Sequence, residues 1–297
     1  AILCASRHGV PILPRGGGTS LAGQTVGPGL VIDCSKHLNR ILEVNSEERW
    51  ARVEPGVVLD QVNDSLRPYG LFFAPDVATS SRANIGGMIG NNSSGTRSVL
   101  YGKTVDHVLE LSTVLAGGDE VVFGPLDPPT LERKCRQEDR EGEIYRAVMS
   151  IVEKNRELIR TRYPKVMRRV SGYNLDELIG DYPLNFAKLL VGSEGTLAVT
   201  TEARLNLLPI PARRGVVVLH FKELLEAIRT VPFLLEYSPS AVEVLDRYGL
   251  ELAYGNPAVA ALCRTFIHND PDAILMFELT GDSEDALRQT LSQVKQD

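Results

Sequence analysis

Cysteines are few in this sequence, and no two of them lie close together. Its 297 residues include four of them, Cys4, Cys34, Cys135 and Cys263. A disulfide-stabilised secreted scaffold, a zinc site or an iron–sulfur cluster needs more thiols or a closer spacing, such as C-x-x-C. We therefore expect reduced thiols that pack as small hydrophobic groups, as in a cytoplasmic protein.

Long hydrophobic runs and an excess of positive charge are also absent. No apolar run approaches the roughly 18 residues that span a bilayer, which leaves peripheral attachment at an inner membrane face as the only membrane option. The 32 basic and 38 acidic residues give a formal charge of -6, whereas nucleic-acid-binding proteins usually carry a strong basic excess. With 43% hydrophobic residues, the chain can bury the core of one large domain or of two ordinary ones.

Up to about residue 123, short strands alternate with helices and glycine-rich loops. This mixture is typical of α+β and α/β enzymes rather than of helical bundles. Alternating apolar residues predict the strands, and a period near 3.6 predicts the helices. The expected helices are Ile2–His8 and Leu59–Arg67, and the expected strands are Val10–Leu13, Leu30–Asp33, Arg52–Gly56 and a hairpin of Glu110–Leu115 with Glu120–Phe123.

From residue 125 to about residue 169 glycine nearly disappears and charged residues become frequent. Apolar residues from Ile144 to Ile159 recur at helical spacing, which predicts one long amphipathic helix after a polar lead-in. The charges, as in Glu138–Glu141, are expected on its solvated face. We interpret this segment as a helical insertion, not as a separate domain.

The proline-containing stretch Pro209–Arg214 marks a second boundary. The elements expected after it favour a small open sheet with helices on one side. No partner strand follows the last helix, so we expect an incomplete second domain in a fragment of a longer protein. The expected elements are the strands Gly215–Phe221 and Ala273–Leu279 and the helices Leu224–Leu235, Ala241–Leu252 and Ser283–Val294.

The segment Arg15–Ser20 places three glycines and two hydroxyl residues directly after a predicted strand. Glycine lets a backbone approach a ligand closely, and successive N–H groups can form an anion-binding nest. The spacings of a P-loop and of a Rossmann fingerprint are absent. At this point two interpretations of the segment stay open: a pyrophosphate-binding loop and a plain flexible loop.

Two further segments are rich in glycine. Asn84–Gly95 combines glycine, asparagine and serine, has little expected core value, and follows the polar stretch Pro75–Thr79. Val191–Thr200 is a tight glycine turn between apolar runs, which on its own is typical of a β-turn. Because several such segments in one domain are hard to explain by packing, we expect them to surround a ligand.

Together these segments resemble the FAD-binding domain of the p-cresol methylhydroxylase and vanillyl-alcohol oxidase type. The sequence is similar to its 2-hydroxy-acid branch, which acts on D-lactate, glycolate or D-2-hydroxyglutarate, and Arg168–Leu175 is similar to the large members fused to an iron–sulfur module. The matching stretches, in order and spacing over about residues 1–208, are Pro14–Gln24, Pro75–Asp76, Ile85–Gly87, Asn91–Gly95, Tyr101–Gly102 and Gly192–Leu197.

The resemblance implies an α+β fold with two domains. Residues 1–208 would form a two-subdomain FAD-binding domain of the p-cresol methylhydroxylase type. That domain would be incomplete at its N-terminus and interrupted by the helical insertion at about residues 125–169. Residues 212–297 would form a partial ferredoxin-like α+β cap domain for the substrate.

The resemblance also implies roles for individual residues. The backbone N–H groups of Gly16–Ser20 would face the FAD pyrophosphate. Some relatives bind flavin through a histidine near this loop, but Gly16–Gly18 has none, so we expect non-covalent FAD. The residues expected to bind the cofactor are Arg15, Gly16, Gly17, Gly18, Thr19, Ser20, Gln24, Pro75, Asp76, Thr79, Ile85, Gly86, Gly87, Asn91, Asn92, Ser94, Gly95, Tyr101, Gly102, Glu194, Gly195, Thr196, Leu197 and Val199.

The implied reaction is oxidation of a D-2-hydroxy acid to the 2-oxo acid, with hydride transfer from C2 to flavin N5. Arg168 and Arg169 are candidates for the substrate carboxylate, because a guanidinium binds carboxylate bidentately. Tyr173 is a candidate pocket wall. For the two arginines the alternative of solvated surface residues stays equally open. For Tyr173 the alternative is an ordinary half-buried tyrosine. The histidines are scattered and the family's H-x-G-D-G-N motif is absent, so we expect the base, any metal ligands and any cluster beyond Asp297.

Two other functions stay open: a non-catalytic flavin-carrying subunit that relays electrons, and an NADPH-dependent flavin reductase of similar fold. Arg168–Leu175 and the β-α start of the second domain favour the hydroxy-acid reaction. The expected partners are a small 2-hydroxy acid and an electron acceptor or iron–sulfur module. A homo-oligomer is a further option, and no nucleic acid is expected.

Overall fold

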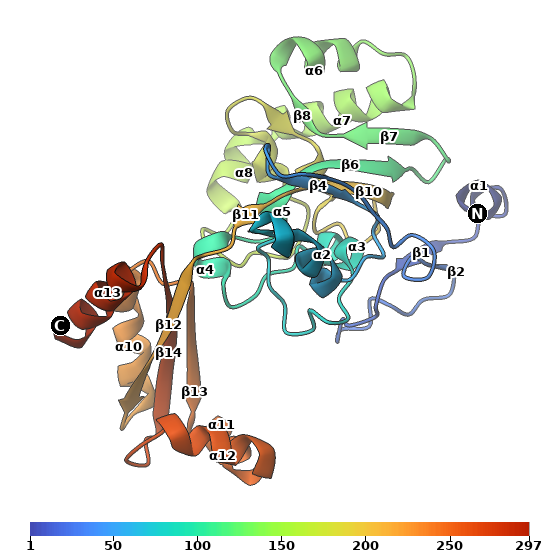
Figure 1. Cartoon of the computed structure of the whole chain (residues 1–297). Coiled ribbons are helices and arrows are strands. Elements are labelled where there is room, and N and C mark those ends of the chain that lie inside the picture. Colours follow the sequence, from blue (N-terminus) through green and yellow to red (C-terminus); the bar gives the residue numbers. More distant parts are fainter. Residues whose placement is uncertain (297) are drawn as a thin grey trace. The chain divides into compact units, whose positions relative to one another are not determined.

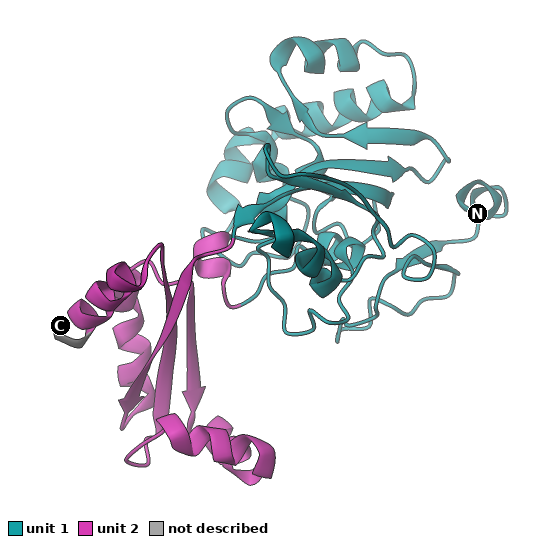
Figure 2. Ribbon diagram, viewed as in Figure 1, with its two compact units in different colours: residues 1–95, 102–209 teal, residues 96–101, 210–297 magenta. Residues whose placement is uncertain are grey.

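The structure is a computed structural model that describes residues 1–296, and it divides into two compact units. Unit 1 comprises residues 1–95 and 102–209, and unit 2 comprises residues 96–101 and 210–297 (Figure 2). The short segment 96–101 therefore lies inside the sequence of unit 1 and packs with unit 2. No helix within residues 1–296 has both the length and the apolar character needed to cross a bilayer.

An antiparallel sheet in the order β3-β4-β10-β6-β7 forms the centre of unit 1 (Figure 1). The strand latest in the sequence, β10, lies in the middle, where Ala203 pairs with both Val53 and Leu111. The sheet can therefore form only when strands from both ends of the sequence of unit 1 come together. The strands are β3 (Ile41–Asn45), β4 (Trp50–Val53), β6 (Val108–Val114), β7 (Glu120–Phe123) and β10 (Val199–Asn206).

Three short strand pairs surround this sheet. β1 pairs with β2 in parallel, so the segments that follow the two strands, which begin at Gly16 and Cys34, leave the pair at the same end. The strand expected at Val10–Leu13 is β1, which begins and ends two residues later in the structure. The pairs are β1 (Ile12–Arg15) with β2 (Leu30–Asp33), β5 (Leu71–Phe72) with β11 (Leu208–Pro209), and β8 (Pro125–Leu126) with β9 (Leu184–Asn185).

One hydrophobic core joins this sheet to the helices α2 (Leu59–Leu66) and α3 (Ile85–Asn91). In α3, Ile85, Met88 and Ile89 are buried at positions i, i+3 and i+4. The expectation that this glycine-rich segment has little core value was therefore wrong, because its apolar residues share one face of a helix. Shorter helical segments are α1 (Ile2–Arg7), α5 (Thr104–His107), α9 (Ala187–Leu190), Arg67–Tyr69 and Leu175–Leu178 in unit 1, and α4 (Ser98–Tyr101) in unit 2.

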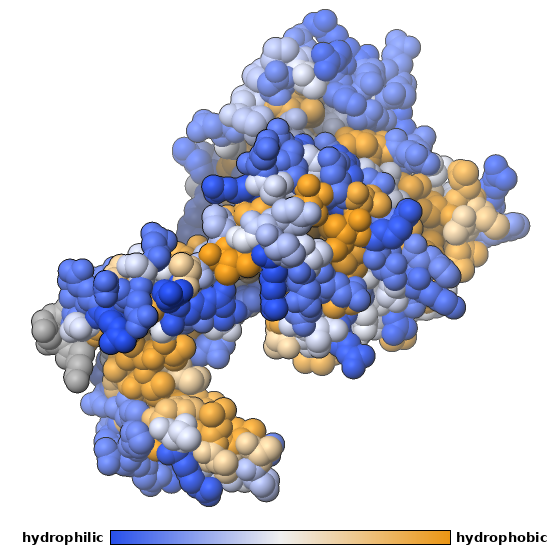
Figure 3. All heavy atoms as spheres, viewed as in Figure 1, coloured by the Kyte–Doolittle hydropathy of each residue, from blue (hydrophilic) through white to orange (hydrophobic). Residues whose placement is uncertain are grey.

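The helical insertion consists of three helices instead of the single long helix expected: α6 (Pro128–Cys135), α7 (Arg140–Lys154) and α8 (Arg156–Arg162). The side chains of Asp127 and Asp139 each accept a backbone N–H, both at 2.9 Å, and so begin α6 and α7 separately. The expected solvated face is confirmed: Figure 3 shows a mostly hydrophilic surface over α6 and α7.

Unit 2 contains a three-stranded antiparallel sheet in the order β12-β14-β13. Its two outer strands run parallel to each other on either side of β14, as the first three strands of a ferredoxin-like sheet do. The elements are β12 (Arg213–Phe221), β13 (Ala241–Asp246), β14 (Ala273–Gly281), α10 (Leu224–Leu235), α11 (Arg247–Gly255), α12 (Pro257–Phe266) and α13 (Glu284–Gln296).

Two expectations for this sheet were wrong. Residues 241–246 form a strand rather than a helix, because Val242 pairs with Phe277 and the Asp246 side chain starts α11 by accepting the Gly249 N–H at 2.8 Å. Helices also cover both faces of the sheet, not one. Of two successive residues on β14, Ile274 packs with buried residues of α11 and α12, whereas Leu275 packs with those of α10 and α13.

A buried carboxylate attaches the segment 96–101 to the sheet of unit 2. Arg97 donates to both oxygens of Glu278, at 2.8 and 3.0 Å, and the Ser240 hydroxyl donates at 2.6 Å. The Glu278 side chain is 12% exposed. The Arg97 guanidinium lowers the pKa of Glu278 below its ordinary value of 4.5.

Replacing Glu278 by Gln should therefore destabilise unit 2 at neutral pH by roughly 1–2 kcal/mol. A lowered carboxyl pKa contributes stability that is present above the ordinary value and is lost as pH falls through the folded-state pKa. Urea unfolding followed by circular dichroism at about pH 7 and about pH 3 measures this. The difference between wild type and variant should shrink at low pH, and an equal difference at both would contradict the assignment. Glu251→Gln, in an exposed pair with Arg247, is the control.

Candidate functional site

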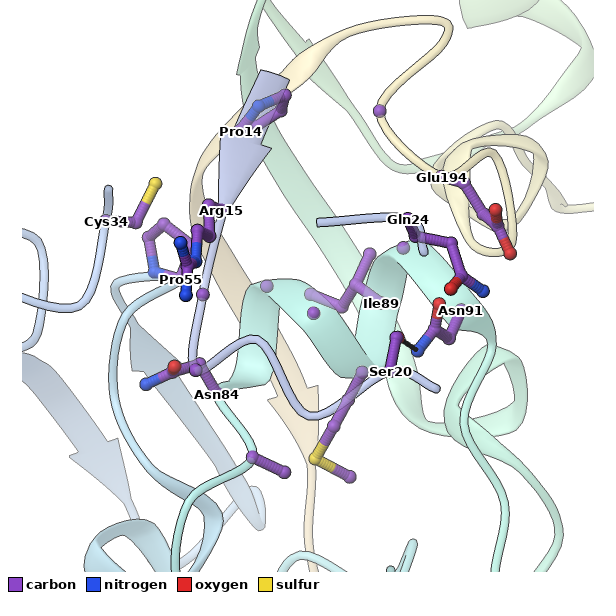
Figure 4. Close-up of a pocket in the computed structure, with 18 of the residues that line it drawn as sticks. Pro14, Arg15, Ser20, Gln24, Cys34, Pro55, Asn84, Ile89, Asn91 and Glu194 are labelled. Atoms are coloured by element: carbon purple, nitrogen blue, oxygen red, sulfur yellow. Dashed lines mark hydrogen bonds between the residues drawn. The ribbon is translucent and has the colours of Figure 1, made fainter. Parts of the chain in front are cut away.

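One cavity in unit 1 is lined by all three glycine-rich segments. Gly16–Ser20 follows β1, Gly86–Asn91 belongs to α3, and Ser193–Gly195 precedes β10 (Figure 4). These segments are far apart in the sequence and meet because β10 closes the sheet beside the earlier strands. The expectation that they surround a common space is thus met by the geometry.

The first loop presents a row of unused backbone donors to this cavity. None of the five N–H groups from Gly16 to Ser20 donates a hydrogen bond to any acceptor within residues 1–296. Adjacent backbone N–H groups of this kind bind anions. The loop therefore suits a phosphate or pyrophosphate group.

Close packing fixes this loop against the segment before α3. A Cβ atom at Gly17 would lie 2.2 Å from the carbonyl oxygen of Arg82, so only glycine allows the approach. At the other end of the loop, the Asn91 amide donates to the Ser20 hydroxyl at 3.0 Å (Figure 4). The loop is thus held at both ends by the residues around α3.

The third glycine segment docks on the carboxyl end of α3. Gly192 N–H donates to the Ile89 carbonyl at 2.8 Å, and Glu194 N–H donates to the Gly90 carbonyl at 3.0 Å. These bonds complete the cavity wall that Ser193, Glu194 and Gly195 provide.

Several side chains give the cavity its polarity. Among the described residues that line it, Arg15 is the only basic side chain and Glu194 the only acidic one. The Gln24 Oε1 and Asn84 Oδ1 atoms are buried there with no hydrogen-bond partner in residues 1–296, and such atoms usually indicate a missing ligand or water. Burial raises the pKa of the Cys34 thiol, which keeps this lining residue neutral.

Just over half of the cofactor residues expected from the sequence line this cavity. Most of these lining residues belong to the first loop or to α3. The structure brings them together from four separate segments of the sequence. They are Arg15, Gly16, Gly17, Gly18, Thr19, Ser20, Gln24, Thr79, Gly86, Gly87, Asn91, Glu194 and Gly195.

The other expected cofactor residues do not line the cavity. The Ile85 side chain lies in the core, and Asn92 is buried with its Oδ1 accepting the Val105 N–H at 3.0 Å. Tyr101 packs in unit 2. The remaining residues outside the cavity are Pro75, Asp76, Ser94, Gly95, Gly102, Thr196, Leu197 and Val199.

Sequence reasoning missed other lining residues. Most of these residues lie inside the stretches that stand out in the sequence and carried the same signal: Pro14, Val77, Asn84, Met88, Ile89, Gly90, Ser93, Ser193, Ala198 and Thr200. The other residues enter the cavity through folding alone and had no local signal. They are Leu13, Thr25, Cys34, Pro55, Ala83 and Leu190.

The candidate substrate residues lie outside this cavity. Arg168 and Arg169 line a second, mostly apolar cavity beside α8, and Arg168 donates to the Gly95 carbonyl at 2.6 Å. The Nη2 group of Arg169 donates to both carboxylate oxygens of Asp176, at 2.8 and 2.7 Å. One side of its guanidinium is therefore paired with a carboxylate of the protein itself, while its Nη1 atom is buried with no hydrogen-bond partner in residues 1–296.

Comparison with known families indicates which cofactor the N-terminal part of this chain binds. Residues 1–124 match the family described as FAD binding domain. The N-terminal part of this chain is thus an FAD-binding domain of that family. The resemblance inferred from the sequence is thereby confirmed, although the turn Ser193–Gly195 lies outside the matched segment.

The curated relatives of this FAD-binding chain belong to the 2-hydroxy-acid branch. D-2-hydroxyglutarate dehydrogenase of Pseudomonas putida is 45% identical over 245 residues, which are 82% of this chain and 24% of that protein. Glycolate oxidase subunit GlcD of Bacillus subtilis is 33% identical, over 82% of this chain and 42% of the relative. This chain therefore spans about a quarter of the length of the first of these relatives.

A solved structure supports the fold of the FAD-binding chain. Alkyldihydroxyacetonephosphate synthase superposes with a TM-score of 0.66 over 99% of this chain and 47% of its own, at 18% identity. At this identity the likeness concerns the fold alone. The expected α+β fold with an FAD-binding domain is confirmed.

The cavity fits FAD on the structure's own evidence. The free N–H groups of Gly16–Ser20 match a pyrophosphate, and the unpartnered atoms of Gln24 and Asn84 offer further hydrogen bonds. Gly87 lines the cavity, and a Cβ atom there would meet nothing within 4 Å. The glycine face of α3 thus leaves space that a side chain would fill.

Replacing Gly87 by Leu should weaken FAD binding by at least about tenfold, because the new side chain would occupy the cavity. Helix α3 should persist, since leucine favours a helix more than glycine does. Fluorescence titration of the apo-protein with FAD measures the Kd, and thermal unfolding reports folding. Gly255→Leu, at the end of α11 with equally open space around its Cβ, is the matched control. Unchanged affinity in Gly87→Leu would place FAD elsewhere.

Proposed function

We propose that this chain is the FAD-binding part of a dehydrogenase that oxidises a D-2-hydroxy acid to the 2-oxo acid. D-2-hydroxyglutarate is the first candidate substrate, because the relatives of 43–45% identity are dehydrogenases of that acid. D-lactate and glycolate follow, from relatives of lower identity. The observation that carries the proposal is the row of free N–H groups from Gly16 to Ser20 in a chain with these relatives.

Residues of this chain would hold the cofactor without a covalent bond. Bound FAD supplies the acceptor for the hydride that leaves C2 of the hydroxy acid. Gly16–Ser20 would bind its pyrophosphate, with Arg15 adding positive charge, and the Gln24 amide would add hydrogen bonds deeper in the cavity. Among the described lining residues none is histidine or tyrosine, which supports the non-covalent mode.

Arg168 is the better candidate for the substrate carboxylate. Its guanidinium is exposed and donates one hydrogen bond within residues 1–296, to the Gly95 carbonyl, whereas Arg169 is paired with Asp176. Gly95 packs directly against Asp76, so Arg168 reaches the segments that the resemblance assigns to the flavin. The remaining guanidinium N–H groups can bind a carboxylate. The proposal also includes an electron acceptor as a partner of the protein, a homo-oligomeric state and a cytoplasmic location.

The reaction is tested by adding D-2-hydroxyglutarate, under anaerobic conditions, to the FAD-loaded full-length protein of which this chain is proposed to be the FAD-binding part. The visible flavin band should bleach with the D-enantiomer and persist with the L-enantiomer, because a site that fixes the carboxylate and the hydroxyl points the single C2 hydrogen toward the flavin in only one of the two configurations. Acid precipitation should leave the flavin in the supernatant. Bleaching by NADPH instead would indicate a flavin reductase, and no bleaching by either compound or by D-lactate would indicate an electron carrier.

Replacing Arg168 by Ala should raise the D-2-hydroxyglutarate concentration needed for half-maximal bleaching by roughly tenfold to a hundredfold, the usual effect of removing a charged hydrogen bond. The Kd for FAD should stay within about twofold. Arg162→Ala removes a neighbouring arginine of the same second cavity and should leave both values unchanged. Equal effects of the two variants would contradict a specific role for Arg168.

A further inference from the structure

The turn that forms the third wall of the FAD cavity has a strained backbone. Gly192, Glu194 and Gly195 all have positive φ, at 85°, 51° and 75°. A glutamate in this region costs energy that neighbouring structure must offset. The two backbone bonds to α3 hold the inner side of the turn, so its outer side needs contacts of its own.

Asn174 holds the beginning of this turn. Its side chain is buried, at 3% exposure, and its Nδ2 group donates to the Val191 carbonyl at 2.7 Å and to the Lys188 carbonyl at 3.2 Å. Both amide hydrogens are thereby used. The end of α9 and the start of the turn are joined to the segment that contains Tyr173.

Tyr173 holds the far end of the turn, and the direction of its hydrogen bond follows from its neighbour. The Thr196 hydroxyl donates its single proton to the Ser193 carbonyl at 2.6 Å. It must therefore accept the bond from the Tyr173 hydroxyl, 2.9 Å away. The result is a relay from Tyr173 through Thr196 to Ser193, in which each bond strengthens the next.

The segment that carries Tyr173 is itself braced. The Tyr163 hydroxyl donates to the Tyr173 carbonyl at 2.8 Å, and the Arg169 guanidinium lies 4.6 Å from the centre of the Tyr163 ring. Asp176 in turn holds Arg169 through the ion pair with its Nη2 group. Residues first considered for substrate binding thus support the position of Tyr173.

We propose that Tyr173 is a positioning residue of the FAD site, whose hydroxyl holds the turn Val191–Leu197 against α3 in the geometry that the cofactor requires. Its phenol proton is committed to Thr196, so Tyr173 does not serve as a proton donor to substrate. The inference concerns cofactor binding and is independent of which substrate the proposed function assigns.

The test compares Tyr173→Phe, Thr196→Val and the double variant. Each single variant should raise the Kd for FAD roughly threefold to tenfold, the effect expected for one uncharged hydrogen bond. The double variant should lose little more than either single one, because both break the same relay. Thr196→Ser keeps the hydroxyl and should restore nearly normal affinity. Tyr69→Phe, at an exposed tyrosine of unit 1, is the matched control.

A second measurement does not depend on FAD. Hydrogen exchange of the apo-protein should show the Gly192 and Glu194 amides exchanging roughly threefold to tenfold faster in Tyr173→Phe, because these amides bond to α3 only while the turn is held. Thermal unfolding should stay near that of wild type. Additive effects on the Kd, or unchanged exchange at both amides, would overturn the proposal. Loss of hydroxy-acid oxidation alone would count against the proposed function and not against this role.

Discussion

The cavity of this protein depends on the docking of one turn onto the end of one helix. Two backbone hydrogen bonds, from Gly192 to Ile89 and from Glu194 to Gly90, join segments about a hundred residues apart. Without them the first glycine loop and α3 would form an open surface rather than a cavity. Because the turn leads directly into β10, the same connection also fixes the strand that closes the sheet.

Helix α3 shows how one short segment serves both the core and the site. Its apolar residues, Ile85, Met88 and Ile89, are buried in the core, and Gly87 and Gly90 line the cavity, which the inner residues Met88 and Ile89 also reach. A helix has room for two such faces because side chains repeat every 3.6 residues. The glycines cost helix stability, and the burial of the apolar face offsets that cost.

The first glycine loop could be predicted because its properties are local. Gly16–Ser20 has backbone N–H groups free to bind an anion, and a run of glycines after a strand indicates such a loop without knowledge of the fold. The roles of Arg168 and Arg169 could not be predicted in the same way. A guanidinium pairs with whichever carboxylate folding brings near, and for Arg169 this is Asp176. The strand at Ala241–Asp246 likewise depends on β14 as its partner.

The sequence by itself determined an α+β or α/β enzyme pattern and the glycine-rich segments, since these follow from spacing and composition along the chain, and its resemblance to a known family implied FAD. Tertiary structure alone decided which residues share the cavity, because Cys34, Pro55 and Thr200 reach it only when distant strands pair. It also decided that the Tyr173 hydroxyl lies 2.9 Å from the Thr196 hydroxyl, in the turn that lines the cavity. The physical reason is that hydrogen-bond partners are chosen by proximity in space, which sequence spacing does not specify beyond a few residues.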